Sequence, residues 1–422
     1  MNISNNKLLA VWVFGFMSGF TLMISSYTLN YWLSEESINL KTIGIFSLIS
    51  LPYAVNFIWA PIFDTIKIPY LSKKYTPKIA WLIIVQLLLS VVTYATSLHN
   101  PLDNIFFIAL FATFIAFFAS AQDSILGAMR TEIVDKSQQG EISGIYIFGY
   151  RIGMLLSSSG AVFISQFFDW QYIYRLFSCV VMLFPFLLIL LLKQDYFLSA
   201  KPRDYKLKDP ILKTGFYQKI TLFVKDILSP VGSKLYLITA MIFLILYRLP
   251  DNFISIMITP FLLNIGYEAF EISTAGKLFG ALSAMMGGLI ASLIMKNRPL
   301  YSSLLLFGSI HAAAHLLYIY QYFNGKDIYI LYLITGVEGM SGGMTMAAYI
   351  AFIASLCEGQ FRATQYAFFS SMMGFSRAIF PSISGYIVLS YGWSSFFIFT
   401  TIATLPALLL IPFLQKLSRN DG

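Results

Sequence analysis

Apolar runs long enough to cross a lipid bilayer recur along this chain from end to end. A membrane-spanning helix needs about 20 predominantly apolar residues. Twelve such runs are predicted, at residues 8–33, 42–63, 78–97, 104–128, 141–167, 171–192, 235–264, 270–295, 300–322, 327–356, 362–390 and 392–415. Only 11% of the 422 residues are charged, whereas an ordinary soluble protein carries about 25%. The sequence therefore predicts an all-α polytopic membrane protein.

A single long polar interval, at residues 193–234, separates the first six runs from the last six. It carries nine Lys or Arg residues against four Asp residues. A weak internal repeat accompanies this division, because INLKTIGIFSL opens the second run and YEAFEISTAGKL opens the eighth. Two six-helix halves that are parallel repeats are the layout of the major facilitator fold. We therefore expect pseudo-symmetric six-helix bundles at residues 1–192 and 235–422, joined by a basic cytoplasmic linker at 193–234.

Lysine and arginine collect in alternate loops, and this asymmetry predicts the orientation of the chain, because cytoplasmic loops are rich in both. The basic loops follow the second and eighth runs and close the chain, at Lys67, Lys73, Lys74, Lys78, Lys296, Arg298, Lys416 and Arg419. Both termini are therefore expected in the cytoplasm. No small-residue cleavage site follows the first run, so we expect that run to be a span rather than a signal peptide. The same loops account for the net charge of +8 without a nucleic-acid partner.

Charged residues inside the apolar runs are the first functional candidates, because each costs about 2.5–3.5 kcal/mol at the centre of a membrane helix. Asp123 in the fourth run and Arg151 in the fifth fall at similar depth on antiparallel neighbours, which predicts an ion pair. Glu338 and Arg377 are predicted to repeat this arrangement in the tenth and eleventh runs. The alternative for both pairs is a purely structural role, locking helices together.

The seventh and eighth runs add further charges near the middle of the second half. Arg248 and Asp251 stand three residues apart and therefore share one helix face. Pro250 lies between them and removes a backbone donor, which favours a break in that helix. Lys277 lies about two turns into the eighth run. These three charged residues are predicted to belong to a binding or moving element.

Polar side chains beside these charges could line a cavity for a sugar-like solute, with Gln122, Tyr150 and Gln365 as candidates. Hydrogen bonds between helices are the alternative role for the two amides. Small residues at GxxxG spacing, which favour close helix packing, accompany them at Gly15 with Gly19, Gly149 with Gly153, and Gly339 with Gly343.

The sequence lacks the motifs expected of an ATP-driven or metal-dependent enzyme. It contains no GxxxxGK[ST] motif and no GxSxG elbow, because GMSGG at residues 339–343 lies within an apolar run rather than at a strand-to-helix turn. Its three histidines have no HExxH or cysteine partners. His311 and His315 share one face of the ninth run and are interpreted as packing residues. We therefore expect no enzyme activity, no cofactor and no metal site. Uphill transport would then use an ion gradient, with Asp123, Asp251 and Glu338 as the available proton carriers.

Several motifs occur in an order that resembles the AmpG muropeptide permeases, a family related to acetyl-CoA transporters. They are QDSILGAMRTE followed by GYRIGM, LKTIGIFSL, IWAPIFD, LYRLPDNF, GVEGMSGGM and ATQYAFFSS, and they extend over nearly the whole chain. The resemblance carries over position by position to Gln122, Asp123, Tyr150, Arg151, Arg248, Asp251, Lys277, Glu338 and Gln365. This chain departs from the family pattern at two positions. It has Gly127 where the pattern has a second acidic residue, and Asn56 where the pattern has a lysine.

The resemblance implies a major facilitator fold in a bacterial inner membrane and proton-coupled import of anhydromuropeptides by alternating access. The expected partners are a muropeptide-like small molecule, protons and membrane lipid, and the expected state is a monomer. The departures leave open a transporter of the same fold for another anionic or glycoconjugate solute, such as an acyl-CoA-like or nucleotide-like compound. A membrane-embedded enzyme or receptor is a third hypothesis, which the lack of a catalytic motif disfavours.

Overall fold

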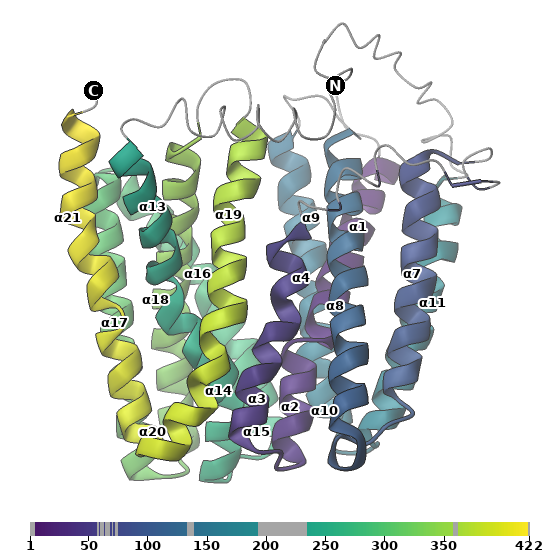
Figure 1. The fold of residues 1–422 in the computed structure, drawn as a ribbon, viewed down its shortest axis with the longest axis horizontal. Helices are drawn as coiled ribbons and strands as arrows, with labels where there is room; N and C mark the ends of the chain where they lie inside the picture. The colour runs from purple at the N-terminus through teal and green to yellow at the C-terminus, as the bar shows by residue number, and fades with distance from the viewer. Residues whose placement is uncertain are drawn as a thin grey trace, which may run out of the picture.

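In a computed structural model, the chain is described at residues 5–56, 59, 63, 68–69, 71, 75–132, 139–192, 234–357 and 362–420. These residues are almost entirely helical, and they contain no strand. The helices run side by side in one bundle, with the start of α1 and the end of α21 at the same end of it (Figure 1). The predicted linker lies outside the described residues except for Lys234, as do Lys67, Lys73 and Lys74.

The helices before the linker region match the first six apolar runs. They are α1 (Asn5–Ile24), α2 (Tyr27–Glu35), α3 (Leu40–Ile45), the 3₁₀ turn η1 (Phe46–Ser50), α4 (Leu51–Ala54), α7 (Pro77–Thr96), α8 (Pro101–Glu132), α9 (Gln139–Leu155), the π-helical η4 (Leu156–Gly160), α10 (Ala161–Ile164) and α11 (Trp170–Leu192). The first and fifth runs are thus each divided into shorter segments. We refer to this part of the chain as the N-terminal half.

The helices after the linker region match the last six runs and form the C-terminal half. They are α13 (Lys234–Tyr247), α14 (Leu249–Ile265), α15 (Ala269–Glu271), the π-helical η6 (Ile272–Phe279), α16 (Gly280–Met295), α17 (Leu300–Asn324), α18 (Ile328–Ser355), α19 (Arg362–Ile379), the 3₁₀ turn η7 (Phe380–Ile383), α20 (Ser384–Ile402) and α21 (Leu405–Asn420). The chain reverses direction within α20 at Gly392, whose φ of 78° is readily adopted only by glycine.

Nine helical stretches of the described chain are long and apolar enough to cross a membrane. One of them, Phe368–Ser418, contains both the eleventh and the twelfth predicted run. The second run is represented by the shorter apolar stretch Leu40–Ala54, and the tenth by α18. All twelve predicted runs therefore overlap helix, and the count of twelve crossings is consistent with the structure.

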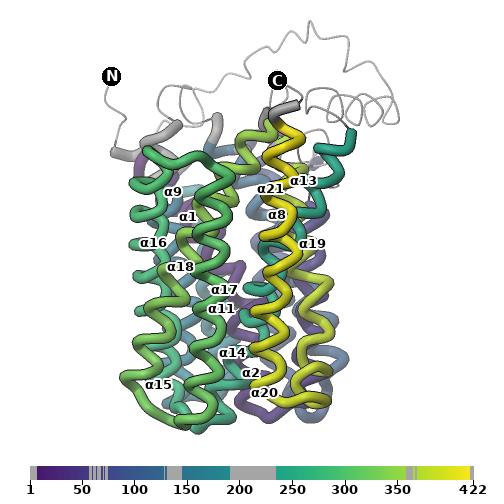
Figure 2. Tube along the Cα trace, turned by 90° about the vertical axis from the view of Figure 1, so that its left-hand side faces the viewer, coloured from purple at the N-terminus to yellow at the C-terminus, as the bar shows by residue number. Residues whose placement is uncertain are grey.

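Glycines bring α1 against α9 and α16 against α18, as the GxxxG spacing predicts. A Cβ atom added at Gly15 or Gly19 would overlap the carbonyl oxygens of Tyr146 and Tyr150 on α9. A Cβ atom added at Gly343 would likewise overlap the carbonyl oxygen of Ala284 on α16. Backbones can approach this closely only where side chains are absent. Each half is thus built around one tightly packed helix pair, seen in Figure 2 for α16 and α18.

The two halves meet mainly through α2, α3, α4 and η4 on one side and α14, η6, α19 and α20 on the other. Of these, α2, α3 and α20 lie toward the end of the bundle opposite the end of α21 (Figure 1). A Cβ atom at Gly385 would overlap the carbonyl oxygen of Leu40, so α20 and α3 are in backbone contact there. The two π-helical segments, η4 and η6, also contact each other across the junction.

Candidate functional site

The seventh predicted span is interrupted at Arg248, as the proline suggested. Helix α13 ends at Tyr247, and α14 begins at Leu249 with Pro250 in its first turn. A proline lacks the N–H group that would continue the helix, but it fits the first turn of a new one. The break places Arg248 and Asp251 beside each other, and their side chains form an ion pair. The two side chains therefore share one face, as their spacing predicted, and the ion pair between them is a finding of the structure.

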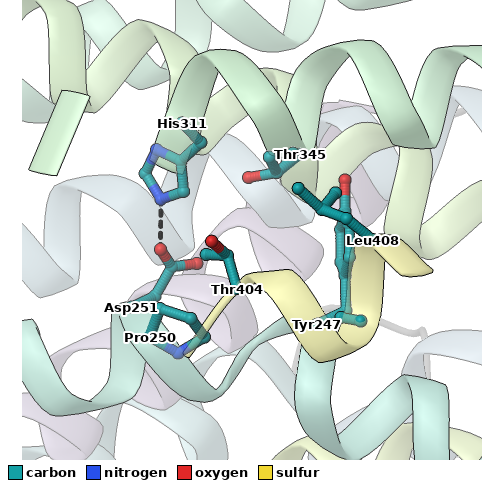
Figure 3. A pocket seen from close by; sticks show the side chains of 9 residues that line it. Tyr247, Pro250, Asp251, His311, Thr345, Thr404 and Leu408 are labelled. Atoms are coloured by element: carbon teal, nitrogen blue, oxygen red, sulfur yellow. Dashed lines mark hydrogen bonds and ion pairs between the residues drawn. The ribbon is translucent and has the colours of Figure 1, made fainter. Parts of the chain in front are cut away.

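Asp251 has a second partner that the sequence interpretation missed. The Nε2 atom of His311 on α17 contacts Oδ1 of Asp251 (Figure 3). The Nδ1 atom of the same ring lies 2.7 Å from Oγ of Ser341 on α18. The interpretation of His311 as a packing residue is wrong, because both of its ring nitrogens have polar partners. Two imidazoles one helical turn apart in an apolar span were the signal that could have indicated this site.

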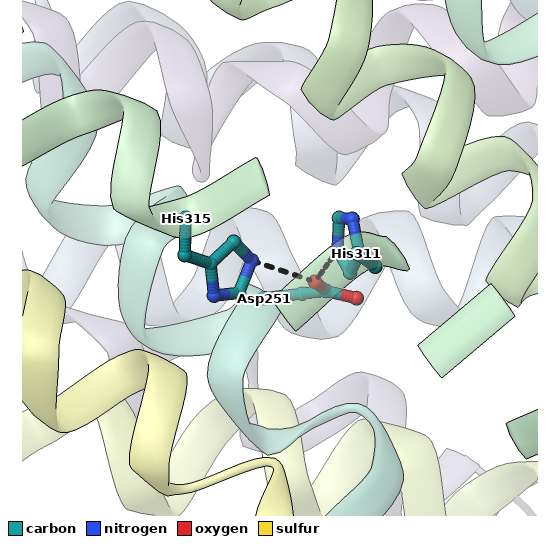
Figure 4. A group of neighbouring side chains, drawn as sticks. All are labelled: Asp251, His311 and His315. Atoms are coloured by element: carbon teal, nitrogen blue, oxygen red, sulfur yellow. Dashed lines mark hydrogen bonds and ion pairs between the residues drawn. The ribbon is translucent and has the colours of Figure 1, made fainter. Parts of the chain in front are cut away.

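His315 completes a group of three side chains (Figure 4). Its Nε2 atom lies 3.7 Å from Oδ1 of Asp251, and its ring packs against His311 with the centroids 4.8 Å apart. It is fully buried and forms no hydrogen bond with the described residues. One imidazole nitrogen from each histidine and one carboxylate oxygen of Asp251, the atoms that could bind a metal ion, lie within 4.8 Å of one another. Because the Arg248 guanidinium already neutralises Asp251, the attraction of this group for a metal cation is weakened.

A small cavity adjoins this group between α13, α14, α17, α18 and α21. Its volume is about 10 Å³, which is room for about one water molecule. The side chains with polar groups that line it are Tyr247, Asp251, His311, Thr345 and Thr404 (Figure 3). The site therefore lies inside the C-terminal half, beside a cavity that is lined by both polar and apolar residues.

Asp123 does not pair with Arg151, so that prediction is wrong. Among the described residues, the partners of the Asp123 carboxylate are the Ser18 hydroxyl on α1 and the Tyr146 hydroxyl on α9, the latter at 3.3 Å. Arg151 forms no ion pair with any described residue. It stands five residues after Tyr146, which at about 100° per residue turns it about 140° away from the face that meets Asp123.

Glu338 and Arg377 also form no ion pair within the described part of the chain, so the second predicted pair is wrong as well. Glu338 interacts electrostatically with His311, Asp251, Lys277 and Arg248 instead. It therefore extends the charged group around Asp251. Arg377 also interacts electrostatically with Lys277, so it adjoins this group without pairing with Glu338.

Arg377, on α19, lies within electrostatic range of tyrosines of the N-terminal half. It interacts electrostatically with Tyr53 on α4 and with Tyr150 on α9. The rings of Tyr146 and Tyr150 stack with centroids 6.3 Å apart, and Asp123 interacts with all three tyrosines. We call Tyr53, Tyr146 and Tyr150 the tyrosine cluster. The Tyr53 hydroxyl is buried without a hydrogen-bond partner among the described residues, which is uncommon for a buried polar group.

Gln122, Gln365 and Gly127 are three further positions that the sequence singles out. The Gln122 amide donates to the Met17 carbonyl and the Thr21 hydroxyl on α1, both at 3.1 Å, so it joins two helices. Gln365 is buried near the start of α19. At Gly127, where the family pattern has an acid, an added Cβ atom would meet nothing within 4 Å.

Comparisons with known proteins identify the family of this chain. The sequence model of the Major Facilitator Superfamily matches residues 9–337 and 302–421. "Putative transporter AmpG 1" of Rickettsia bellii is 49% identical over 407 residues, which cover 96% of this chain and 98% of that protein. "Anhydromuropeptide permease" of Escherichia coli is 30% identical over 401 residues, covering 94% of this chain and 78% of that protein.

Solved structures with the same fold include a bacterial homologue of the human lysosomal transporter Spinster, in an inward-facing conformation. Its TM-score is 0.72 at 13% identity, with 100% of this chain and 99% of that chain covered. A D-xylose-proton symporter gives a TM-score of 0.69 at 11% identity, with 96% of both chains covered. The chain is a multi-pass membrane transporter rather than an enzyme, and it belongs to the AmpG family of the major facilitator superfamily.

Proposed function

We propose that this chain imports anhydromuropeptides across a bacterial inner membrane in symport with protons, by alternating access and as a monomer. The relative named "Anhydromuropeptide permease", which is similar over 94% of this chain, supports the substrate class. An ion gradient is the energy source that remains for a chain without a nucleotide-binding motif, and the buried carboxylates and histidines favour the proton as that ion. No cofactor is part of this proposal.

The tyrosine cluster with Arg377 is the observation that carries the proposed solute site. An anhydromuropeptide joins a disaccharide to an acidic peptide, so it offers sugar faces, hydroxyl groups and carboxylates. Tyrosine rings provide flat surfaces for sugars and hydroxyl groups that form hydrogen bonds. Arg377 provides a planar guanidinium group, which can donate two hydrogen bonds to one carboxylate. Because these residues come from both halves, a solute bound among them would respond to movement of one half against the other.

Lys277 is proposed as a second contact for a solute carboxylate. It lies at the junction on η6, with its Nζ atom 3.5 Å from the ring centroid of Tyr27 in the N-terminal half. An ammonium held by an aromatic ring can be transferred to a carboxylate without first losing a strong ion pair. The proposed solute site therefore has a cation on each of two C-terminal helices.

Uptake of labelled anhydromuropeptide into cells that lack their own permease tests this function. Cells expressing the chain should accumulate the label, and a protonophore should abolish the accumulation. Arg377→Ala should reduce uptake at least tenfold, whereas Arg175→Ala, at a helix end outside the proposed site, should leave it within twofold. Uptake no higher than in cells carrying the empty vector contradicts the muropeptide assignment.

A transporter of the same fold for another anion is the second candidate, and the open position at Gly127 together with Asn56 favours it. These two positions lack the charged residues of the family pattern, so the N-terminal half presents a different surface. A thermal-shift panel of anhydromuropeptide, acyl-CoA and nucleotide compounds separates the candidates. Stabilisation by an acyl-CoA or a nucleotide alone would favour this second function.

A further inference from the structure

We propose that His311, held between Asp251 and Ser341, carries the transported proton, and that Asp251 itself stays ionised. This inference rests on the proposed proton coupling and assigns it to particular atoms. The sequence had suggested Asp123, Asp251 and Glu338 as carriers. The geometry points instead to the imidazole that contacts Asp251 inside the C-terminal half.

The hydrogen bonds around His311 leave room for one additional proton. Ser341 has a single hydroxyl hydrogen, and its Oγ lies 3.1 Å from the backbone carbonyl oxygen of Glu338. When Ser341 donates to that carbonyl, the Nδ1 atom of His311, at 2.7 Å, must be the donor to Oγ. The Nε2 atom faces Asp251, an acceptor, and must carry a hydrogen as well. In this arrangement His311 is an imidazolium.

The same positions also accommodate neutral His311. If the Ser341 hydroxyl rotates to donate to Nδ1, the ring keeps its Nε2–H donor to Asp251 and is uncharged. Proton loading is then the addition of one proton at Nδ1 and a rotation of the Ser341 hydroxyl toward the Glu338 carbonyl. Proton release reverses both changes. No heavy atom has to move, and both states satisfy the ring nitrogens.

The charges that surround His311 in the described structure fit this exchange. Arg248 and Asp251 face it from the start of α14, His315 from its own helix, and Glu338 from α18. Lys277 interacts with Glu338 from η6, so two carboxylates face two fixed cations, and the loaded imidazolium adds a positive charge that contacts the Asp251 carboxylate directly. The cavity beside Asp251 and His311 has room for about one water molecule, which would deliver the proton.

The loaded state also changes the competition for Asp251. In the neutral state Arg248 is the only full positive charge on that carboxylate, and in the loaded state His311 is the second. Arg248 has an alternative partner in the Thr345 hydroxyl, 3.4 Å from Nη1. Because Arg248 forms the break between α13 and α14, its transfer from Asp251 would link proton binding to the angle between these helices.

Transport by the full chain in liposomes tests the assignment, with labelled anhydromuropeptide as the probe. Two rates are measured: accumulation driven by an inward proton gradient, and exchange of internal for external label without a gradient. His311→Gln should reduce accumulation at least tenfold and leave exchange within twofold. His99→Gln, which removes an imidazole that bonds to the Ala95 carbonyl outside the site, should change neither. Ser341→Ala should require a more acidic external medium for half-maximal accumulation, and Ser303→Ala should not.

Nitrogen NMR of the histidine rings tests the proton site independently of transport, because the chain has only three histidines. The signals are assigned with His99→Gln and His315→Gln. The His311 ring should change from one to two protonated nitrogens between about pH 9 and pH 5, the range around the unperturbed histidine value. A ring that stays singly protonated, or accumulation by His311→Gln equal to that of the unsubstituted chain, overturns this inference. If the unsubstituted chain does not transport the probe, the proposed function fails, and the NMR titration still decides whether His311 binds the proton.

Discussion

The ammonium of Lys277 lies over the ring of Tyr27, with Nζ 3.5 Å from the ring centroid, and the two residues belong to opposite halves of the chain. Tyr27 is on α2 and Lys277 is on η6, a π-helical segment in contact with η4 of the N-terminal half. A π-helical turn is rare and is often found at functional sites. The contact therefore links an irregular stretch of one half to the first span of the other.

We expect Tyr27 and Lys277 to be coupled in stability, because a desolvated cation–π contact contributes about 2 kcal/mol. A double-mutant cycle with Tyr27→Leu and Lys277→Met measures the coupling from unfolding in SDS titrations. Tyr27→Phe keeps the aromatic ring and should therefore preserve most of the coupling energy. Additive effects of the two substitutions contradict the contact.

Asp251→Asn should be strongly destabilising, because it leaves Arg248 and loaded His311 without their counter-charge. Removing one partner of a buried pair costs about 3–5 kcal/mol. The free energy of unfolding is measured at pH 6, and again at pH 9, where a neutral His311 should make the loss smaller. Asp103→Asn, an exposed acid in the first turn of α8, serves as the control and should cost less than about 1 kcal/mol. Equal losses for the two variants would show that the Asp251 carboxylate is not a buried counter-charge.

Asp123 should be coupled to Ser18 and independent of Arg151. Residues without shared partners have additive effects within about 0.5 kcal/mol, whereas hydrogen-bonded partners deviate by about 0.5–3 kcal/mol. Two cycles compare Asp123→Asn combined with Ser18→Ala and Asp123→Asn combined with Arg151→Gln. A larger coupling with Arg151 than with Ser18 would restore the ion pair expected from the sequence.

Two helical glycines should respond in opposite directions to alanine. A Cβ atom at Gly127 meets nothing within 4 Å, so Gly127→Ala should stabilise the chain by about 0.5–1 kcal/mol through its helix propensity. A Cβ atom at Gly153 overlaps the carbonyl oxygen of Phe16 on α1, so Gly153→Ala should destabilise it. Thermal unfolding of the two variants measures both signs. A lower thermal unfolding midpoint for Gly127→Ala would mean that other atoms occupy the space beside Gly127.

Gly385→Ala should separate the halves where α20 touches α3, because the added Cβ would overlap the Leu40 carbonyl oxygen. Spin labels at Lys41 and Ser382, in a chain with Cys179 and Cys357 replaced by alanine, report the distance across this junction. The distribution should move to longer distances in Gly385→Ala. Gly160→Ala is the matched control, since its nearest atom would be 3.8 Å away. An unchanged distribution in Gly385→Ala would show that the contact is not required at the junction.

The sequence by itself determined the class of protein and the course of its helices. The length of each apolar run specified where a helix could span the bilayer. In an α-helix every backbone group of the run can form its hydrogen bond without water. Pro250 predicted the break at Arg248, and the GxxxG spacing predicted the close helix pairs, because both effects depend on residues near one another in the chain. The motif order predicted the AmpG family, which the relatives confirmed.

Only the tertiary structure decided which buried charges meet. Depth along a helix follows from residue number, but the direction of a side chain around the helix decides its partner, and that direction depends on which helices pack together. Because Gly149 and Gly153 draw α9 against α1, Asp123 meets Ser18 and Tyr146, and Arg151 is turned away. The approach of α17 to the start of α14 likewise brings His311 to Asp251 over 60 residues of sequence, a contact that no local pattern specifies.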